Sequence, residues 1–167
     1  MNPNRRRLGF VLAAAAMLTA LVLPLAGATA APLSARPWPF ALTLASVLLF
    51  AAAAWAGGWR AAAFGFAGAL CGAVTTLALL RDGNVGGSAA SGYWAMVLAV
   101  WLGSALGVIQ LAAQRPRDHA SRRALNLVVP LVFGAVVFYL WEVSVRGFGV
   151  SPVIMPAPSA AAARFIA

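Results

Sequence analysis

Few side chains in this 167-residue chain could carry acid–base, nucleophilic or metal chemistry. The sequence holds three acidic residues, one histidine and one cysteine. Glu142 is the only acid inside a long apolar stretch, and Arg146 follows it by four residues, a spacing that permits an ion pair along a helix. His119 and Cys71 lack the several neighbouring ligands that a metal ion needs. We therefore expect no catalytic residue, no metal, no cofactor and no enzymatic activity.

The composition excludes an ordinary soluble domain. Only 9% of the residues are charged and 63% are hydrophobic, whereas soluble domains carry about 25% charged residues. The net charge of +9 would suggest nucleic-acid binding in a soluble protein. In a chain this apolar, excess arginine is typical of loops that face anionic lipid headgroups. We therefore expect a lipid bilayer as the partner, and no nucleic acid.

Five apolar stretches approach the roughly 20 residues that a helix needs to cross a bilayer. They run from about 8 to 31, 40 to 56, 61 to 80, 93 to 113 and 125 to 145. The sequence thus predicts an all-α, polytopic membrane protein with about five transmembrane helices. Glu142 falls one turn before the end of the last stretch, where we interpret it as a paired or hydrated interfacial acid rather than a substrate or proton site.

The arginines predict the orientation, because positive residues of short loops stay on the cytoplasmic side. With the amino terminus inside, eight arginines are cytoplasmic and four are external. The cytoplasmic set is Arg5, Arg6, Arg7, Arg60, Arg115, Arg117, Arg122 and Arg123, and the external set is Arg36, Arg81, Arg146 and Arg164. Five crossings then place the carboxyl terminus in the periplasm. The first stretch also resembles a signal peptide, but its length favours an uncleaved helix.

Two of the stretches carry glycines at the spacing that packs membrane helices closely. The pairs are Gly68 with Gly72 and Gly103 with Gly107, and Gly65 adds a second small face. Small residues four apart form a groove on a helix surface. We therefore expect the helices at 61–80 and 93–113 to pack on each other or on a partner.

The last quarter of the chain differs from the rest. Trp141 and Glu142 lie near the end of the fifth stretch, and Pro156, Pro158 and Ser159 follow in the short segment after it. Residues 122–167 resemble the beginning of the permease subunits of bacterial ABC importers of the nitrate, sulfonate and taurine class. In that family a basic leader precedes a first helix with a Leu-Trp-Glu-like triplet, and a Leu/Ile-x-Pro-x-Pro-Ser element follows. We expect Ser159 to be the N-cap of a helix over 160–167.

The resemblance implies three parts. These are a four-helix membrane region at 1–113, a basic cytoplasmic loop at 114–124, and a first permease-like helix with an external Pro-x-Pro segment at 125–167. It implies a component of an importer for small anions or small organic nutrients in the bacterial cytoplasmic membrane. Where the full permease exists, its partners would be an ABC ATPase and a periplasmic solute-binding protein, and other membrane subunits are further candidate partners.

The family's Glu-Ala-Ala-type coupling loop, which docks the ATPase, does not occur in this sequence. The chain therefore resembles an amino-terminal portion of a permease, either truncated or a fragment. The alternative is a small accessory subunit that packs through its glycines against other subunits of a larger membrane complex.

Overall fold

The computed structural model describes residues 3–26, 33–83, 85, 87–114 and 119–166, and over these residues the prediction of an all-helical fold is confirmed. No strand occurs among them. The helices are α1 (Pro3–Val22), α2 (Pro37–Trp55), α3 (Gly58–Arg81), α4 (Ser91–Ala112), α5 (His119–Gly147) and α6 (Pro158–Ile166), with the 3-10 turn η1 (Leu33–Ala35) before α2.

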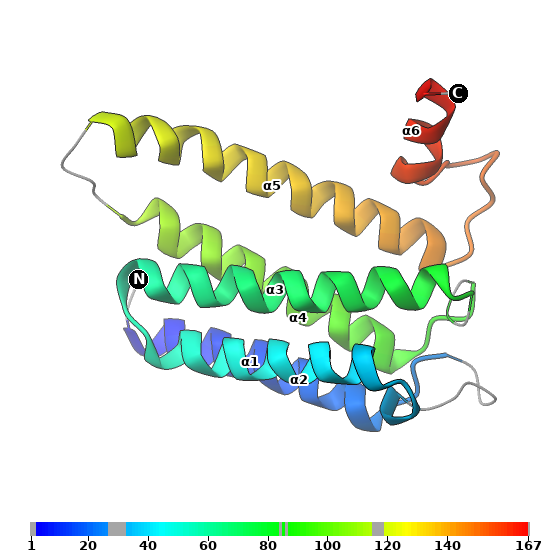
Figure 1. Cartoon of the computed structure of the whole chain (residues 1–167), viewed down its shortest axis with the longest axis horizontal. Helices are drawn as coiled ribbons and strands as arrows, with labels where there is room; N and C mark the ends of the chain where they lie inside the picture. The colour runs from blue at the N-terminus through cyan, green and yellow to red at the C-terminus, as the bar shows by residue number, and fades with distance from the viewer. Residues whose placement is uncertain (1–2, 27–32, 84, 86, 115–118, 167) are drawn as a thin grey trace.

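Helices α1 to α4 form a four-helix bundle, in which consecutive helices run in opposite directions (Figure 1). Helix α3 packs between α2 and α4, and α1 contacts the same two helices from the other side. Helix α5 approaches the bundle only toward its carboxyl end, where it contacts α4 and α3, and its first half diverges from α4 (Figure 1). The short helix α6 packs on α5.

Four helices are long and apolar enough to cross a membrane: α2, α3, α4 and α5. Helix α1 differs because its first turns carry Arg5, Arg6 and Arg7. It has comparable length and lies beside α2 and α4, but its role as a fifth span stays a prediction. Its bounds correct the predicted stretch at 8–31, since the helix ends at Val22, and residues 27–31 lie outside the described residues.

The segments between helices are short, and two of them show how the sequence ends one helix and begins the next. Helix α2 ends at Trp55 and α3 begins at Gly58, whose positive φ of 57° suits a residue without a Cβ.

Helix α5 begins at His119, so the predicted loop at 114–124 is wrong over 119–124, which is helical. The polar side chains there face solvent, and an exposed polar first turn does not prevent a helix from starting.

Two aromatic rings in the core of the bundle fit against glycines of neighbouring helices. Phe50 of α2 is completely buried, and a Cβ on Gly68 of α3 would come within 2.9 Å of its ring. A Cβ on Gly103 of α4 would overlap the same ring. Phe10 of α1 lies in the same way against Gly65, at 2.8 Å. One aromatic side chain thus fills the space between two helices where glycine leaves room.

The other two predicted packing glycines lie in the bundle as well. A Cβ on Gly72 would come within 2.5 Å of Met17 of α1, and one on Gly107 within 2.9 Å of Phe66 of α3. Helices α3 and α4 do contact each other, as the glycine pattern predicts. However, the glycines chiefly receive side chains from α1, α2 and α3, because a groove between small residues in a bundle accepts a ring as readily as a backbone.

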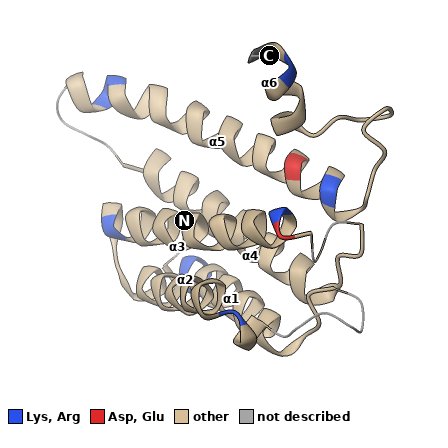
Figure 2. Cartoon of the chain, turned by 45° about the vertical axis from the view of Figure 1, so that its right-hand side comes forward, with Lys and Arg blue, Asp and Glu red and all other residues tan. Residues whose placement is uncertain are grey.

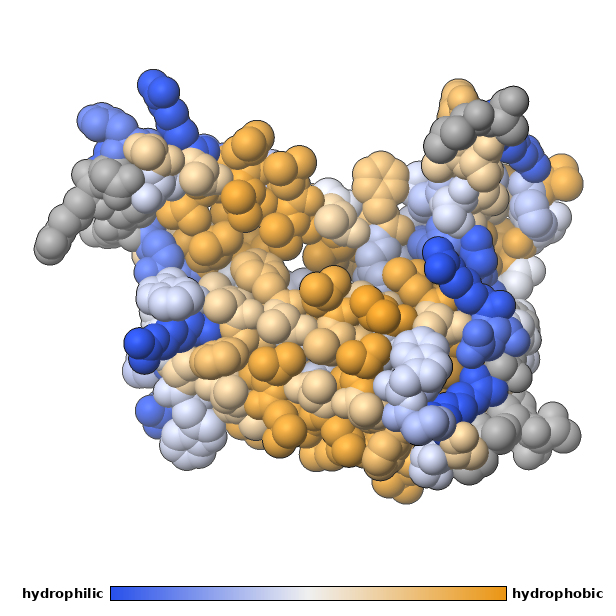
Figure 3. Space-filling model, viewed as in Figure 1, coloured by the Kyte–Doolittle hydropathy of each residue, from blue (hydrophilic) through white to orange (hydrophobic). Residues whose placement is uncertain are grey.

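Charged residues gather at the two ends of the helices, and apolar side chains cover the surface between them (Figures 2 and 3). At the end where α1, α3 and α5 begin, the described charged residues are all arginines: Arg5, Arg6, Arg7, Arg60, Arg122 and Arg123. Arg115 and Arg117 lie outside the described residues. The opposite end carries four described arginines together with Asp82 and Glu142. This asymmetry agrees with the predicted orientation, which stays a prediction.

Candidate functional site

Two of the residues that carry the family resemblance meet where α6 packs against α5. The backbone N–H of Ser159 donates to Oε2 of Glu142 at 3.0 Å, and the Ser159 hydroxyl donates to Oε1 at 2.7 Å. Arg146 forms the expected i,i+4 ion pair with Glu142 through its Nε. Its Nη2 also donates to the Ser159 hydroxyl oxygen at 2.7 Å. We call these three residues the α5–α6 clasp.

The clasp corrects the prediction that Ser159 is the N-cap of the last helix. Helix α6 begins at Pro158, which places Ser159 inside the first turn. Proline suits the first position of a helix because its missing N–H would have no partner there. The exposed N–H of Ser159 is instead satisfied by the Glu142 carboxylate. A negative charge beside a helix N-terminus is also favourable for the helix dipole, so Glu142 of α5 does the capping.

The other three motif residues lie outside the clasp, and one of them, Pro158, is the first residue of α6. Trp141 stacks on Phe138 with ring centroids 6.2 Å apart, and its indole Nε1 is buried without a hydrogen-bond partner among the described residues. Pro156 is half-buried in the segment that leads into α6. The structure thus brings Glu142 and Ser159 together, although they lie 17 positions apart in the sequence.

A polar contact also joins α5 to the bundle, and no pattern in the sequence predicts it. The hydroxyls of Thr76 on α3 and Tyr139 on α5 lie 2.9 Å apart in a hydrogen bond. The Thr76 side chain is completely buried. Just past the end of α5, the ring of Phe148 stacks on that of Trp94 of α4 with centroids 4.4 Å apart. Trp94 also packs on Gly147, where an added Cβ would lie 3.1 Å from its ring. These contacts fix the carboxyl half of α5.

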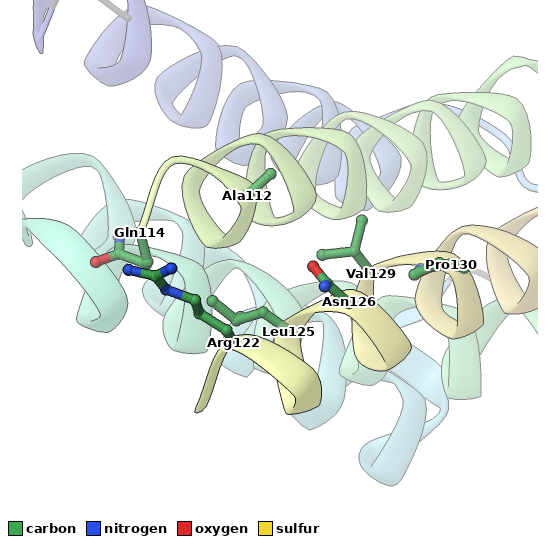
Figure 4. A pocket seen from close by; sticks show the side chains of 7 residues that line it. All are labelled: Ala112, Gln114, Arg122, Leu125, Asn126, Val129 and Pro130. Atoms are coloured by element: carbon green, nitrogen blue, oxygen red, sulfur yellow. The ribbon is translucent and has the colours of Figure 1, made fainter. Parts of the chain in front are cut away.

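The amino half of α5 borders a cavity of about 560 Å³ that opens between α4 and α5 (Figure 4). Its lining comprises Ala112, Gln114, Arg122, Leu125, Asn126, Val129 and Pro130. Figure 4 shows Asn126 and Val129 directed toward α4, and Arg122 directed toward Gln114 at the charged end. We call this space the α4–α5 wedge. Four of its seven lining residues are apolar (Ala112, Leu125, Val129 and Pro130), so it fits an apolar chain or helix better than a soluble metabolite.

The described residues contain no group of three or more histidine, cysteine, aspartate or glutamate side chains that could hold a metal ion. Comparison of the chain with protein-family models, with curated proteins and with solved structures finds no match. The function is therefore argued from this chain's own residues.

Proposed function

We propose that the chain is an integral membrane component of a bacterial ABC-type importer for small anions or small organic nutrients. The observation that carries this proposal is the α5–α6 clasp. The two sequence elements that resemble a permease, one around Glu142 and one around Ser159, form a single hydrogen-bonded unit. Sequence elements that act together in a family are expected to meet in space, and unrelated apolar sequence gives no reason for such a contact.

The arrangement of α5 supports the same proposal. None of the residues in its membrane-spanning window is buried within the chain, whereas a third or more of the corresponding windows of α2, α3 and α4 are buried. In a permease, the helices of the core together line the path that the substrate follows through the membrane. Helix α5 would be the first of these helices, and the bundle of α1 to α4 would be an appended membrane region. Further helices of the importer would fill the α4–α5 wedge.

In this proposal the arginine-rich end lies in the cytoplasm, and α6 lies at the periplasmic face of the inner membrane. The ATPase subunit would act from the arginine-rich side. The solute-binding protein would deliver substrate near α6. The charged residues of the clasp serve to hold α6 in place, because both carboxylate oxygens of Glu142 are already engaged by Ser159 and Arg146.

The test is isolation of the assembly from its native membrane. The chain is tagged at its amino terminus at the chromosomal locus, extracted in mild detergent and purified. We expect an ATP-binding subunit to co-purify in a fixed ratio and the sample to hydrolyse ATP. Recovery of an assembly without an ATP-binding subunit, or of the chain alone, would overturn the importer proposal.

A pair of variants links the assembly to the wedge. In Val129→Trp an indole fills the space that other helices would occupy, and we expect loss of co-purification without unfolding of the bundle. Leu131→Trp is the matched control, since Leu131 lies on the exposed side of the same helix and is 62% exposed. Unchanged co-purification in Val129→Trp would place the partner elsewhere.

A second candidate function is an accessory subunit of a different membrane complex. The wedge favours it independently of the family resemblance, because any complex with a protruding apolar helix could use that space. The same purification separates the two proposals. An accessory subunit would be recovered with a larger membrane complex that contains no ATP-binding protein.

A further inference from the structure

A second cavity lies at the opposite end of α5, between α3, α5 and α6. Its volume is about 360 Å³, and its polar lining comes from Arg81, Tyr139, Glu142, Arg146 and Ser159. Charged segments of α3 and α5 lie at this same end of the molecule (Figure 2). Two guanidinium groups and one carboxylate therefore share one small space.

The charges in this cavity do not balance. Nε of Arg146 pairs with Glu142, and both carboxylate oxygens of Glu142 are engaged within the clasp. The charge of Arg146 is thus matched by that of Glu142. Arg81 makes neither a hydrogen bond nor an ion pair through its guanidinium with the part of the chain that the structure describes. The next residue, Asp82, pairs with Arg36 at 3.5 Å. One positive charge remains for a ligand.

The remaining wall of the cavity is apolar. Leu77, Leu80 and Phe138 form this wall, and the Phe138 side chain is 58% exposed. Arg81 is the last residue of α3, a helix of 24 residues that is about 36 Å long at 1.5 Å per residue. A helix of that length crosses the bilayer core of about 30 Å and places its last residue at the level of the headgroups.

We propose that this cavity binds the phosphate group of one anionic phospholipid, such as phosphatidylglycerol. The Arg81 guanidinium donates to the phosphate oxygens, since its fork of donors matches two oxygens of one phosphate. Tyr139 borders the same space with its hydroxyl bonded to Thr76, and the acyl chains lie along Leu77 and Phe138. A soluble phosphate or sulfonate offers the same oxyanion, but it would leave the apolar wall uncovered. The inference concerns a lipid site on a membrane protein and stands apart from the importer proposal.

The test titrates the purified full chain in detergent with phosphatidylglycerol, with phosphatidylcholine and with methanesulfonate, and follows binding by native mass spectrometry and by the melting temperature. We expect one tightly held phosphatidylglycerol and weaker binding of phosphatidylcholine, whose positive headgroup would face Arg81. Arg81→Gln should weaken phosphatidylglycerol binding about tenfold or more, since a hydrogen bond to a charged group is lost.

Two further variants keep the result interpretable. Arg60→Gln removes an arginine from the opposite end of the same helix, and it should leave phosphatidylglycerol binding unchanged. Arg81→Lys keeps the positive charge and should retain most of the phosphatidylglycerol binding. This variant is compared with the unsubstituted chain if Arg81→Gln folds poorly. Equal binding of both lipids, or unchanged binding in Arg81→Gln, would overturn the proposal. So would stabilisation by methanesulfonate that depends on Arg81 and is absent with phosphatidylglycerol, which would make this a site for a soluble oxyanion.

Discussion

The bundle of α1 to α4 and the arm formed by α5 and α6 are both apolar and helical, yet they are held in different ways. In the bundle, Phe10 and Phe50 are completely buried against glycines of two helices. In the arm, Gly134 has nothing within 4 Å of its Cβ position, and Phe133 is 64% exposed. Hydrophobicity alone therefore does not decide which membrane helices pack together.

The two regions differ because the solvent around the helices is lipid. Lipid tails are as apolar as leucine, so an apolar helix gains little by leaving lipid for another helix. Close steric fit and hydrogen bonds between helices decide instead. Ser46 of α2 donates to the Gly68 carbonyl of α3 at 2.8 Å, which adds a polar link to the close fit there. Helix α5 has such links only over its carboxyl half, among the residues that the structure describes. We therefore expect substitutions in the bundle to lower stability more than matched substitutions in α5.

The largest effect is expected from Gly103→Leu. The new side chain would overlap the Phe50 ring in the centre of the bundle. Because the Cβ alone would already overlap the ring, we expect the cost to exceed the upper end of the about 1–3 kcal/mol that is typical of core overpacking. Little folded protein should therefore remain in size-exclusion chromatography after mild heating. Gly134→Leu on α5 is the matched control and should leave the melting temperature unchanged. Equal loss in both variants would remove the contrast between bundle and arm.

A smaller but still large effect is expected from Phe50→Ala. The completely buried ring leaves a cavity that its glycine neighbours cannot fill, at a cost of about 3 kcal/mol. Phe133→Ala on α5 removes the same group from an exposed position and should cost almost nothing. The measurement is the melting temperature of each purified variant in detergent. If Phe50→Leu restores the melting temperature of Gly103→Ala, the contact between the Phe50 ring and Gly103 is the one that limits packing.

Glu142→Gln should loosen α6 without affecting the bundle. The substitution removes the ion pair with Arg146 and weakens the two hydrogen bonds from Ser159, a local loss of about 1–3 kcal/mol. We expect faster hydrogen exchange of the α6 amides and an unchanged melting temperature. Phe165→Ala, at a position that is 92% exposed on α6, serves as the control. Unchanged exchange in Glu142→Gln would show that the clasp does not hold α6.

The smallest effect is expected at the link between α3 and α5. Tyr139→Phe removes the hydrogen bond to Thr76 and should cost about 0.6 kcal/mol, a typical value for hydrogen bonds between membrane helices. A double-mutant cycle with Thr76→Val isolates this term, because Thr76 also bonds to the Gly72 carbonyl of its own helix. A coupling energy of zero would mean that the stacked rings of Trp94 and Phe148 hold α5 by themselves.

The sequence predicted much of the helical pattern, because the length and hydropathy of a spanning helix follow from the thickness of the bilayer. The stretch expected at 61–80 is the helix Gly58–Arg81, and the one at 93–113 is Ser91–Ala112. The ends were less accurate. Helix α5 begins at His119 rather than near 125, since a polar first turn carries no hydropathy signal.

The candidate sites could be predicted only in part. The spacing of Glu142 and Arg146 predicts their ion pair, because both lie one turn apart on a single helix. The third member of the clasp, Ser159, comes from another helix, and no periodicity relates it to them. The hydrogen bond between Thr76 and Tyr139 joins residues 63 positions apart. Contacts of this kind depend on how α5 lies against α3.

The sequence by itself determined that this protein is helical and apolar with charges at the helix ends, because lipid demands internal hydrogen bonding of the backbone and excludes unpaired charge. Only the tertiary structure decided that Phe50 fills the space beside Gly68 and Gly103, that the amino half of α5 diverges from α4, and that Arg81 lines a cavity beside the clasp. The hydropathy of a single helix determines whether that helix lies in lipid. The shapes of the side chains that meet between helices determine which helices pack together.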